Sequence, residues 1–164
     1  MSILRVNTPT GNPTLDLALD TLKKEKQAIV FVNSKASAEK TAEDISKKIS
    51  LDNEELTRLS NQVLKVLSRP TKQCERLANC VKRGIAYHHA GLVAKQRELI
   101  EDSFREGKIR IICSTPTLAY GLDLPAYRVI IRDLRRFGPR GLAWIPVLEY
   151  LQQCGRAGRP KFDK

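Results

Sequence analysis

The sequence predicts an α/β fold in which a mainly parallel β-sheet is flanked by helices on both faces. Short apolar runs rich in β-branched residues alternate along the 164-residue chain with segments whose apolar residues recur at helical spacing. The run at 28–32, Ala-Ile-Val-Phe-Val, has no polar residue and is typical of a strand buried on both faces. Because strands and helices alternate, consecutive strands are joined by helices, which favours parallel pairing. The length predicts a single domain over 1–164 with its own hydrophobic core.

The first half of the chain supplies one strand and four helices. Apolar residues at helical spacing predict helices near 15–22, 38–49, 56–67 and 71–83, around the strand at 28–32. Asp52 is expected to cap the third of these helices, with Glu55 completing a capping box. Pro70 separates that helix from the fourth.

The second half continues the alternation and adds a hairpin. Strands are predicted at 85–87, 109–113 and 127–132, and helices at 93–105 and 146–154. Pro146 is well placed as the first residue of the last helix. Gly138-Pro139-Arg140-Gly141 is turn material between two extended pieces, which predicts a short β-hairpin over 133–145.

The charge of the chain indicates an anionic partner. The net charge is +11, and residues 128–164 hold nine basic and three acidic residues, a local excess of +6. Nucleic acid, nucleotide phosphates and a membrane face are all compatible with such a surface, and so is an ordinary solvated face without a partner. The longest purely apolar run has five residues, so no membrane span is expected.

The remaining composition points to a cytoplasmic protein without a metal site. The start of the chain lacks the apolar stretch of a signal peptide. The four cysteines form no CxxC pair, so zinc is not expected, and they are interpreted as buried or incidental thiols in a reducing compartment. In parallel sheets ligands bind beyond the carboxyl ends of the strands, which directs attention to the loops 33–36, 114–123 and 152–160.

The strongest motif is Gln152-Gln-Cys-Gly-Arg-Ala-Gly-Arg159, in which two Gly-Arg pairs lie three residues apart. Glycine lets the backbone pass close to a ligand, and arginine offers a planar, permanently charged fork for phosphate oxygens. Arg156 and Arg159 can therefore converge on one phosphoryl group, although a basic loop without a specific partner remains the alternative. The motif is similar to the QxxGRxGR signature of superfamily 2 helicases.

Three further segments carry the same resemblance. Residues 114–125 resemble the preceding helicase motif, in which a threonine-containing loop leads into A-x-G-x-D, and residues 29–34 resemble the first motif of the second motor domain. His88-His-Ala-Gly-Leu92 is similar to the HHAGL pattern of the Ski-type, Hjm-like branch. The motifs occur in the family's order over about residues 27–162.

The resemblance covers one motor domain of the two that such helicases use. The chain has neither a GxxxxGK[ST] phosphate loop nor a DExH or DExD box, which belong to the first motor domain. This implies a second RecA-like domain, and a fragment of a larger enzyme without its first motor domain, winged helix and ratchet domain. ATP and Mg²⁺ would be held mainly by the first motor domain of the same polypeptide, so the isolated chain is expected to be inactive.

The resemblance also implies roles at the ATP cleft. Arg159 is the expected arginine finger with Arg156 beside it, and Gln152 is expected to order the triphosphate. Asp123 would accept from the ribose hydroxyls, with a helix cap or turn residue as the alternative. Close backbone approach to the nucleotide is expected at three glycines: Gly121, Gly155 and Gly158.

On the opposite flank, the resemblance implies backbone contacts to a single nucleic-acid strand. Hydroxyl and amide donors at Asn33, Ser34, Thr115 and Thr117 can bind phosphates without reading sequence. Local helix capping by Ser34 or Thr117 is the alternative. His89 with Gly91 is expected on the same surface, and a histidine packed in the core is the alternative reading for His89.

In the Ski-type branch the hairpin position is occupied by a strand-separating wedge. The resemblance implies that Arg135, Arg136, Phe137 and Arg140 form it here, with the aromatic ring stacked on the last base pair and the arginines holding the split strands. An ordinary basic turn is the alternative. The implied partner is single-stranded or forked DNA rather than RNA, with 3′-to-5′ travel; a non-catalytic nucleic-acid-binding module of helicase-like fold is the rival function.

Overall fold

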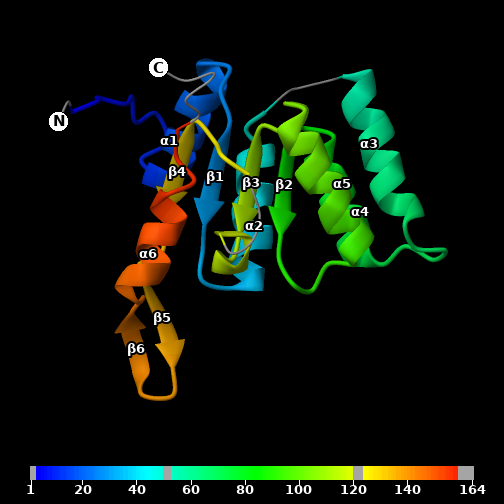
Figure 1. The fold of residues 1–164 in the computed structure, drawn as a ribbon. Coiled ribbons are helices and arrows are strands. Elements are labelled where there is room, and N and C mark those ends of the chain that lie inside the picture. The colour runs from blue at the N-terminus through cyan, green and yellow to red at the C-terminus, as the bar shows by residue number, and fades with distance from the viewer. Residues whose placement is uncertain (1–2, 50–52, 120–123, 159–164) are drawn as a thin grey trace.

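The fold is built on a parallel sheet whose four strands follow the predicted apolar runs (Figure 1). The computed structural model describes residues 3–49, 53–119 and 124–158. The sheet order is β2-β3-β1-β4, and every neighbouring pair is parallel. The four strands are β1 (Ala28–Phe31), β2 (Ile85–His88), β3 (Ile111–Ser114) and β4 (Arg128–Ile131). The expected α/β class with a mainly parallel sheet is confirmed.

The helices also follow the predicted segments. They are α1 (Pro13–Lys23), α2 (Lys35–Ser46), α3 (Glu54–Lys65), α4 (Lys72–Val81), α5 (Ala94–Arg105) and α6 (Val147–Cys154), with a short 3₁₀ helix η1 (Pro116–Ala119). The predicted hairpin is confirmed as β5 (Arg135–Gly138) paired antiparallel with β6 (Gly141–Trp144). No helix in the described part of the chain is long and apolar enough to cross a membrane.

The strand order places helices on both faces of the sheet. The chain moves from β1 across β3 to β2, and then returns from β2 to β3 in the opposite direction. Because such crossovers are right-handed, the helices of the first connection and α5 of the second lie on opposite faces. In Figure 1, α2 accordingly lies behind the sheet while α5 lies in front.

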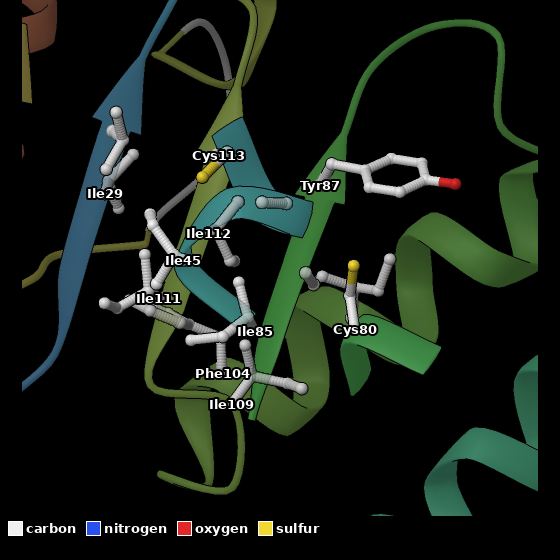
Figure 2. Close-up of a cluster of buried hydrophobic side chains, with 14 of the residues drawn as sticks. Ile29, Ile45, Cys80, Ile85, Tyr87, Phe104, Ile109, Ile111, Ile112 and Cys113 are labelled. Carbon is white, nitrogen blue, oxygen red and sulfur yellow. The ribbon is translucent and has the colours of Figure 1, made fainter. Parts of the chain in front are cut away.

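The core lies between the sheet and these helices. All four residues of β1, β2 and β3 are buried, which explains why their sequences are continuous apolar runs rather than alternating ones. Figure 2 shows Ile29, Ile112 and Ile85 from the three strands, with Ile45 of α2 and Phe104 of α5 among the residues that complete the cluster. Three of the cysteines, Cys74, Cys80 and Cys113, are buried free thiols, as the sequence predicted for them.

Two predicted helix boundaries are corrected by one position. The cap of α3 is Asn53, whose side chain accepts from the Glu55 backbone N–H at 2.8 Å, while Asp52 lies outside the described residues. Pro146 is the N-cap of α6 rather than its first helical residue. In both cases the first residue with helical backbone is one position later than predicted, a shift that periodicity cannot detect.

Helix α6 carries the chain from one edge of the sheet back to the other. The strands end at the lower edge of the sheet in Figure 1, here called the carboxyl edge, and the hairpin extends beyond it. From the hairpin, α6 runs back along β4, and the chain after it pairs with Ala126, two residues before β4 begins. Therefore the described part of the 152–160 loop lies at the opposite, amino edge, and not beside the loops at 33–36 and 115.

Candidate functional site

The carboxyl edge brings together four of the predicted nucleic-acid residues. Asn33 and Ser34 follow β1, His89 follows β2, and Thr115 follows β3. The Thr115 N–H donates to the His88 carbonyl at 3.4 Å, which ties the ends of β2 and β3 together. Since these strands are neighbours in the sheet, segments separated by up to 82 residues form one continuous edge.

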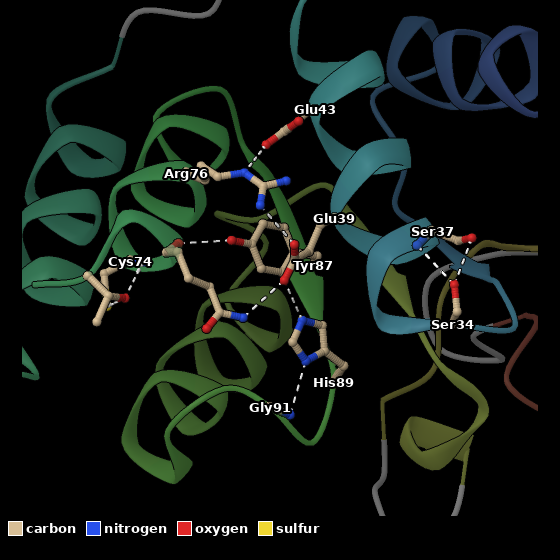
Figure 3. Close-up of polar contacts among 11 residues, drawn as sticks. Ser34, Ser37, Glu39, Glu43, Cys74, Arg76, Tyr87, His89 and Gly91 are labelled. Carbon is tan, nitrogen blue, oxygen red and sulfur yellow. Dashed lines mark hydrogen bonds and ion pairs between the residues drawn. The ribbon is translucent and has the colours of Figure 1, made fainter.

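The side chains of Ser34 and Asn33 are used within the fold. Ser34 caps α2, because its hydroxyl oxygen accepts from the Ser37 backbone N–H at 3.1 Å (Figure 3). The Asn33 backbone N–H donates to Asp133 Oδ2 at 3.0 Å, and its side-chain Nδ2 donates to the Arg135 carbonyl at 2.9 Å. Both residues are exposed, so their remaining polar atoms still face solvent at this edge.

His89 is held inside the fold by bonds on both ring nitrogens. It is 1% exposed, and its Nδ1 accepts from the Gly91 N–H at 3.0 Å. Because Nδ1 is an acceptor, Nε2 carries the hydrogen and donates to Glu39 at 2.9 Å. The ring also stacks on Tyr87, with centroids 5.7 Å apart. His89 therefore shapes the turn at Gly91, and the exposed Gly91 backbone is the part of this pair that can contact a strand.

A charged network continues from Glu39 into the helices behind the turn (Figure 3). Arg76 of α4 pairs with Glu39 at 3.0 Å and with Glu43 at 2.5 Å. Burial opposes ionisation of Glu39, but hydrogen bonds from His89 and Gln73 outweigh it and lower the pKa of this carboxyl. The turn after β2 is thus fixed to α2 and α4 through one ionised carboxylate.

The adjacent His88 forms a second histidine–glutamate pair. The sequence analysis treated His88 only as part of the HHAGL motif. Its Nε2 lies 2.8 Å from Glu101 Oε1 of α5, while its buried Nδ1 has no hydrogen-bond partner. Burial disfavours the charged ring and lowers the pKa of His88, and Glu101 opposes this only in part. The two histidines therefore attach the end of β2 to helices on opposite faces of the sheet.

The hairpin is exposed over all its residues and has two distinct faces. In an antiparallel pair, opposed residues share a face and faces alternate along each strand. The register Arg135↔Trp144 and Phe137↔Leu142 therefore puts these four side chains on one face. Phe137 is 83% and Trp144 65% exposed, and the Arg135 guanidinium lies 4.1 Å from the Trp144 ring centre. Trp144 and Leu142 were not among the predicted residues, although strand alternation from Phe137 could have found them.

The other face of the hairpin is attached to α6. Arg136 Nη1 donates to Glu149 Oε1 at 2.8 Å, and the Glu149 side chain is 5% exposed. Arg136 was expected to hold a nucleic-acid strand; in the structure its guanidinium engages this buried carboxylate. Arg140 lies exposed in the turn between β5 and β6.

At the amino edge, the arginine motif is clamped to the segment that precedes β4. The Ala126 N–H donates to the Arg156 carbonyl at 2.8 Å, and the Gly158 N–H donates to the Ala126 carbonyl at 2.6 Å. Gly158 has φ of +85°, which only glycine adopts without strain. These bonds bring the residues just after the A-x-G-x-D segment next to the arginine motif, as one nucleotide site requires.

Several predicted residues lie outside the described part of the chain, namely Gly121, Asp123, Arg159 and the side chain of Thr117. Gln152 is half-buried and Gln153 is fully buried. The Oε1 atom of each side chain has no hydrogen-bond partner. Gly155 ends α6, where a Cβ would lie 3.3 Å from the Leu151 carbonyl oxygen. The unpaired atoms of the two glutamines are acceptor oxygens, so the positive charge that suits anionic phosphates comes here from the partly exposed Arg156 guanidinium.

The described residues do not add a metal centre to this site. No group of three or more His, Cys, Asp or Glu side chains within 3–49, 53–119 and 124–158 could hold a metal ion. The described residues at the amino edge offer arginine and amide groups, which can stabilise phosphoryl charge and orient a nucleotide.

Comparison with known proteins matches most of the chain to one protein family. The family model described as the helicase conserved C-terminal domain matches residues 13–161. The chain is 46% identical over 164 residues to a Methanocella arvoryzae protein and 46% identical over 151 residues to one from Pyrococcus abyssi. A Methanococcus vannielii protein is 41% identical over 165 residues.

All three relatives bear the name ATP-dependent DNA helicase Hel308. The match covers 96% of this chain for the Methanocella arvoryzae protein, 91% for the Pyrococcus abyssi protein and 99% for the Methanococcus vannielii protein. They cover 22%, 21% and 22% of the relatives, so the chain spans about a fifth of their length.

Proposed function

Since the chain belongs to the helicase conserved C-terminal domain family, we propose that it is the second motor domain of an ATP-dependent DNA helicase of the Ski-type, Hjm-like branch. The names of its relatives and the order of its motifs support this assignment. ATP and Mg²⁺ are held mainly by the first motor domain of the same polypeptide. This domain supplies the arginines and the nucleic-acid edge.

The observation that carries the proposal is the clamp between Ala126 and the arginine motif. Its two backbone hydrogen bonds hold Arg156 and Gly158 against Ala126, which follows the 114–123 segment by three residues; that segment begins with Ser114, the last residue of β3, on the carboxyl edge. One connection therefore joins both edges of the sheet. A nucleotide at the amino edge and a DNA strand at the carboxyl edge would act on the same piece of chain.

On the nucleotide side, the guanidinium groups of Arg156 and Arg159 offset the charge that develops on the γ-phosphoryl oxygens. In related phosphoryl transfers such an arginine accelerates hydrolysis by about 10³–10⁵-fold. Gln152 orders the triphosphate, and Asp123 accepts from the ribose. ATP binding closes the two motor domains and hydrolysis lets them separate, which moves the enzyme 3′ to 5′ along one strand.

On the DNA side, the exposed face of the hairpin is suited to strand separation. Its two aromatic rings offer stacking surfaces, worth about 1–3 kcal/mol per base in known complexes. Phe137 lies nearest the tip, next to the turn that carries Arg140. A ring at this position can stack on the last base pair while Arg135 and Arg140 contact the phosphates of the separating strands.

The exposed apolar side of α6 is also consistent with contact to a second domain. Val147, Leu148 and Leu151 are each more than half exposed, on the side of the helix away from buried Glu149 and Gln153. A row of exposed apolar side chains marks a surface that another domain covers. We assign the first motor domain of the same polypeptide to this role, beside the arginine motif.

The test is Arg159→Ala and Arg156→Ala in the intact helicase that contains this chain. Arg159→Ala is expected to lower DNA-stimulated ATP hydrolysis by about 10³-fold or more, because the arginine acts on the transition state. The matched control is Arg58→Ala on α3, whose guanidinium is exposed and whose helix lies on the opposite side of the molecule from β4 and α6 (Figure 1). ATP hydrolysis unaffected by Arg159→Ala would instead support the non-catalytic nucleic-acid-binding module.

DNA specificity and direction need a separate assay. Unwinding of a duplex with a 3′ single-stranded tail, and not of one with a 5′ tail, is the expected result. Equal unwinding of RNA and DNA forks would contradict the assignment to a DNA helicase.

A further inference from the structure

The hairpin is joined to α6 through a buried charge. Glu149 stands in the first turn of α6, where a carboxylate also interacts favourably with the helix dipole. Its side chain is almost completely buried, and Arg136 of β5 donates to it at 2.8 Å. A buried carboxylate that loses its cation is left with an uncompensated charge, so this pair strongly favours one placement of the hairpin on the helix.

The base of the hairpin has a second anchor on β1. Asn33 donates its backbone N–H to Asp133 and its side-chain amide to the Arg135 carbonyl, as described above. The Ile145 N–H donates to the Leu134 carbonyl at 2.9 Å, which extends the ladder by one pair beyond β5 and β6. The hairpin therefore meets the rest of the domain at the end of β1 and at the start of α6.

Helix α6 connects this attachment to the arginine motif. Gln152 follows Glu149 by three residues, and Arg156 lies just beyond the end of the helix. At 1.5 Å per residue, the distance from Glu149 to Arg156 along the axis is about 10 Å. Because a short helix is stiff, a movement imposed on its arginine end reaches the hairpin only if the first turn is firmly attached to it.

We propose that Arg136 and Glu149 are positioning residues that make the hairpin and α6 move as one body, and so couple the nucleotide side of the domain to strand separation. The proposal rests on the proposed helicase function. It gives Arg136 a role in holding the hairpin rather than a nucleic-acid strand. The aromatic face remains free for DNA, because the ion pair lies on the opposite face.

The first experiment measures hairpin motion directly. Trp144 is the only tryptophan of the 164-residue chain, and it stands on β6. Glu149→Gln is expected to speed the decay of Trp144 fluorescence anisotropy, since a charged hydrogen bond shifts such a local equilibrium by about tenfold or more. The matched control is Asp20→Asn, which removes the carboxylate of another partly buried arginine pair, Asp20–Arg128, away from the hairpin.

The second experiment measures coupling in the intact helicase. Glu149→Gln is expected to leave DNA-stimulated ATP hydrolysis within about twofold and to lower the base pairs opened per ATP by about fivefold or more. The charge swap Arg136→Glu with Glu149→Arg is expected to restore the ratio. Should Glu149→Gln fail to fold, Arg136→Lys replaces it, because lysine keeps a cation for the buried carboxylate but loses the planar guanidinium that positions the hairpin.

The outcomes separate this proposal from the proposed function. A parallel fall in hydrolysis and unwinding, or no change in either anisotropy or coupling, would overturn the positioning role. A wild-type protein that hydrolyses no ATP and opens no duplex would overturn the helicase assignment instead, and the anisotropy experiment would still decide whether the ion pair holds the hairpin.

Discussion

Gly91→Ala tests the turn after β2 with a single methyl group. An ideal Cβ at Gly91 would lie 3.0 Å from both Cε1 and Nδ1 of His89, closer than normal side chains approach. The ring cannot retreat freely, because its far nitrogen is bonded to Glu39 at 2.9 Å. Gly91 does not have a positive φ, so alanine causes no backbone strain there and the contact with His89 is the whole perturbation.

The magnitude follows from three contributions. Losing or distorting the hydrogen bond from Gly91 to His89 costs about 0.5–1.5 kcal/mol. Crowding a well-packed ring adds about 1–3 kcal/mol, while the reduced entropy of the unfolded chain returns about 0.4–1 kcal/mol. The expected net loss is about 1–3 kcal/mol, which lowers the melting temperature of a chain this size by roughly 2–4 °C per kcal/mol.

The assay is thermal and urea unfolding of Gly91→Ala alone and in a His89→Ala background. With the ring removed, the methyl group has room, so Gly91→Ala should become neutral or slightly stabilising. The matched control is Gly138→Ala, where no atom lies within 4 Å of the new Cβ and no loss is expected. Equal destabilisation by Gly91→Ala in both backgrounds would refute the reasoning, because the cost would then not come from His89.

Three further changes test other parts of the fold. Burial lowers the pKa of His88 from the ordinary 6.5, so the unfolded chain binds a proton on this ring more readily than the folded chain does. The free energy of unfolding should therefore fall as the pH drops from 7.5 to 5.5. Urea titrations of His88→Gln should show a weaker dependence on pH. Ile112→Ala, at a fully buried position in β3 between β1 and β2, should cost about 2–5 kcal/mol in urea unfolding, and a loss below 1 kcal/mol would contradict the packing described. Asn53→Ala should cost about 0.5–2 kcal/mol and increase amide exchange at Glu55, whereas a cap at Asp52 would predict no effect.

The elements of the fold were predictable where one local signal dominated. Continuous apolar runs identified β1 and its neighbours, because strands covered on both faces need no polar residue. The hairpin was predictable from its Gly-Pro-Arg-Gly turn. Boundaries were less so: Asp52 was predicted to cap α3, whereas the structure has Asn53 in that place, and only backbone geometry distinguishes two adjacent residues that can both cap a helix.

The roles of the polar residues were harder to predict from the sequence. Ser34 and His89 were each assigned two readings, and the structure shows the local contacts of both: a helix cap for Ser34, and a buried bond to Glu39 for His89. Nothing in the sequence predicted a buried ion pair for Glu149, because a lone carboxylate in a helix pattern looks like a surface residue. Its importance lies in a partner 13 residues away on a hairpin.

The sequence alone determined which segments form strands and helices, and which motifs the chain carries, because periodicity, turn residues and spacing are properties of neighbouring positions. The tertiary structure decided how those motifs are distributed in space. The return of α6 along β4 separates the arginine motif at the amino edge from the residues at the carboxyl edge that we propose to contact nucleic acid, and it brings Glu149 within hydrogen-bond distance of Arg136. These arrangements depend on which distant segments pack together, and burial and charge pairing across the fold set that choice.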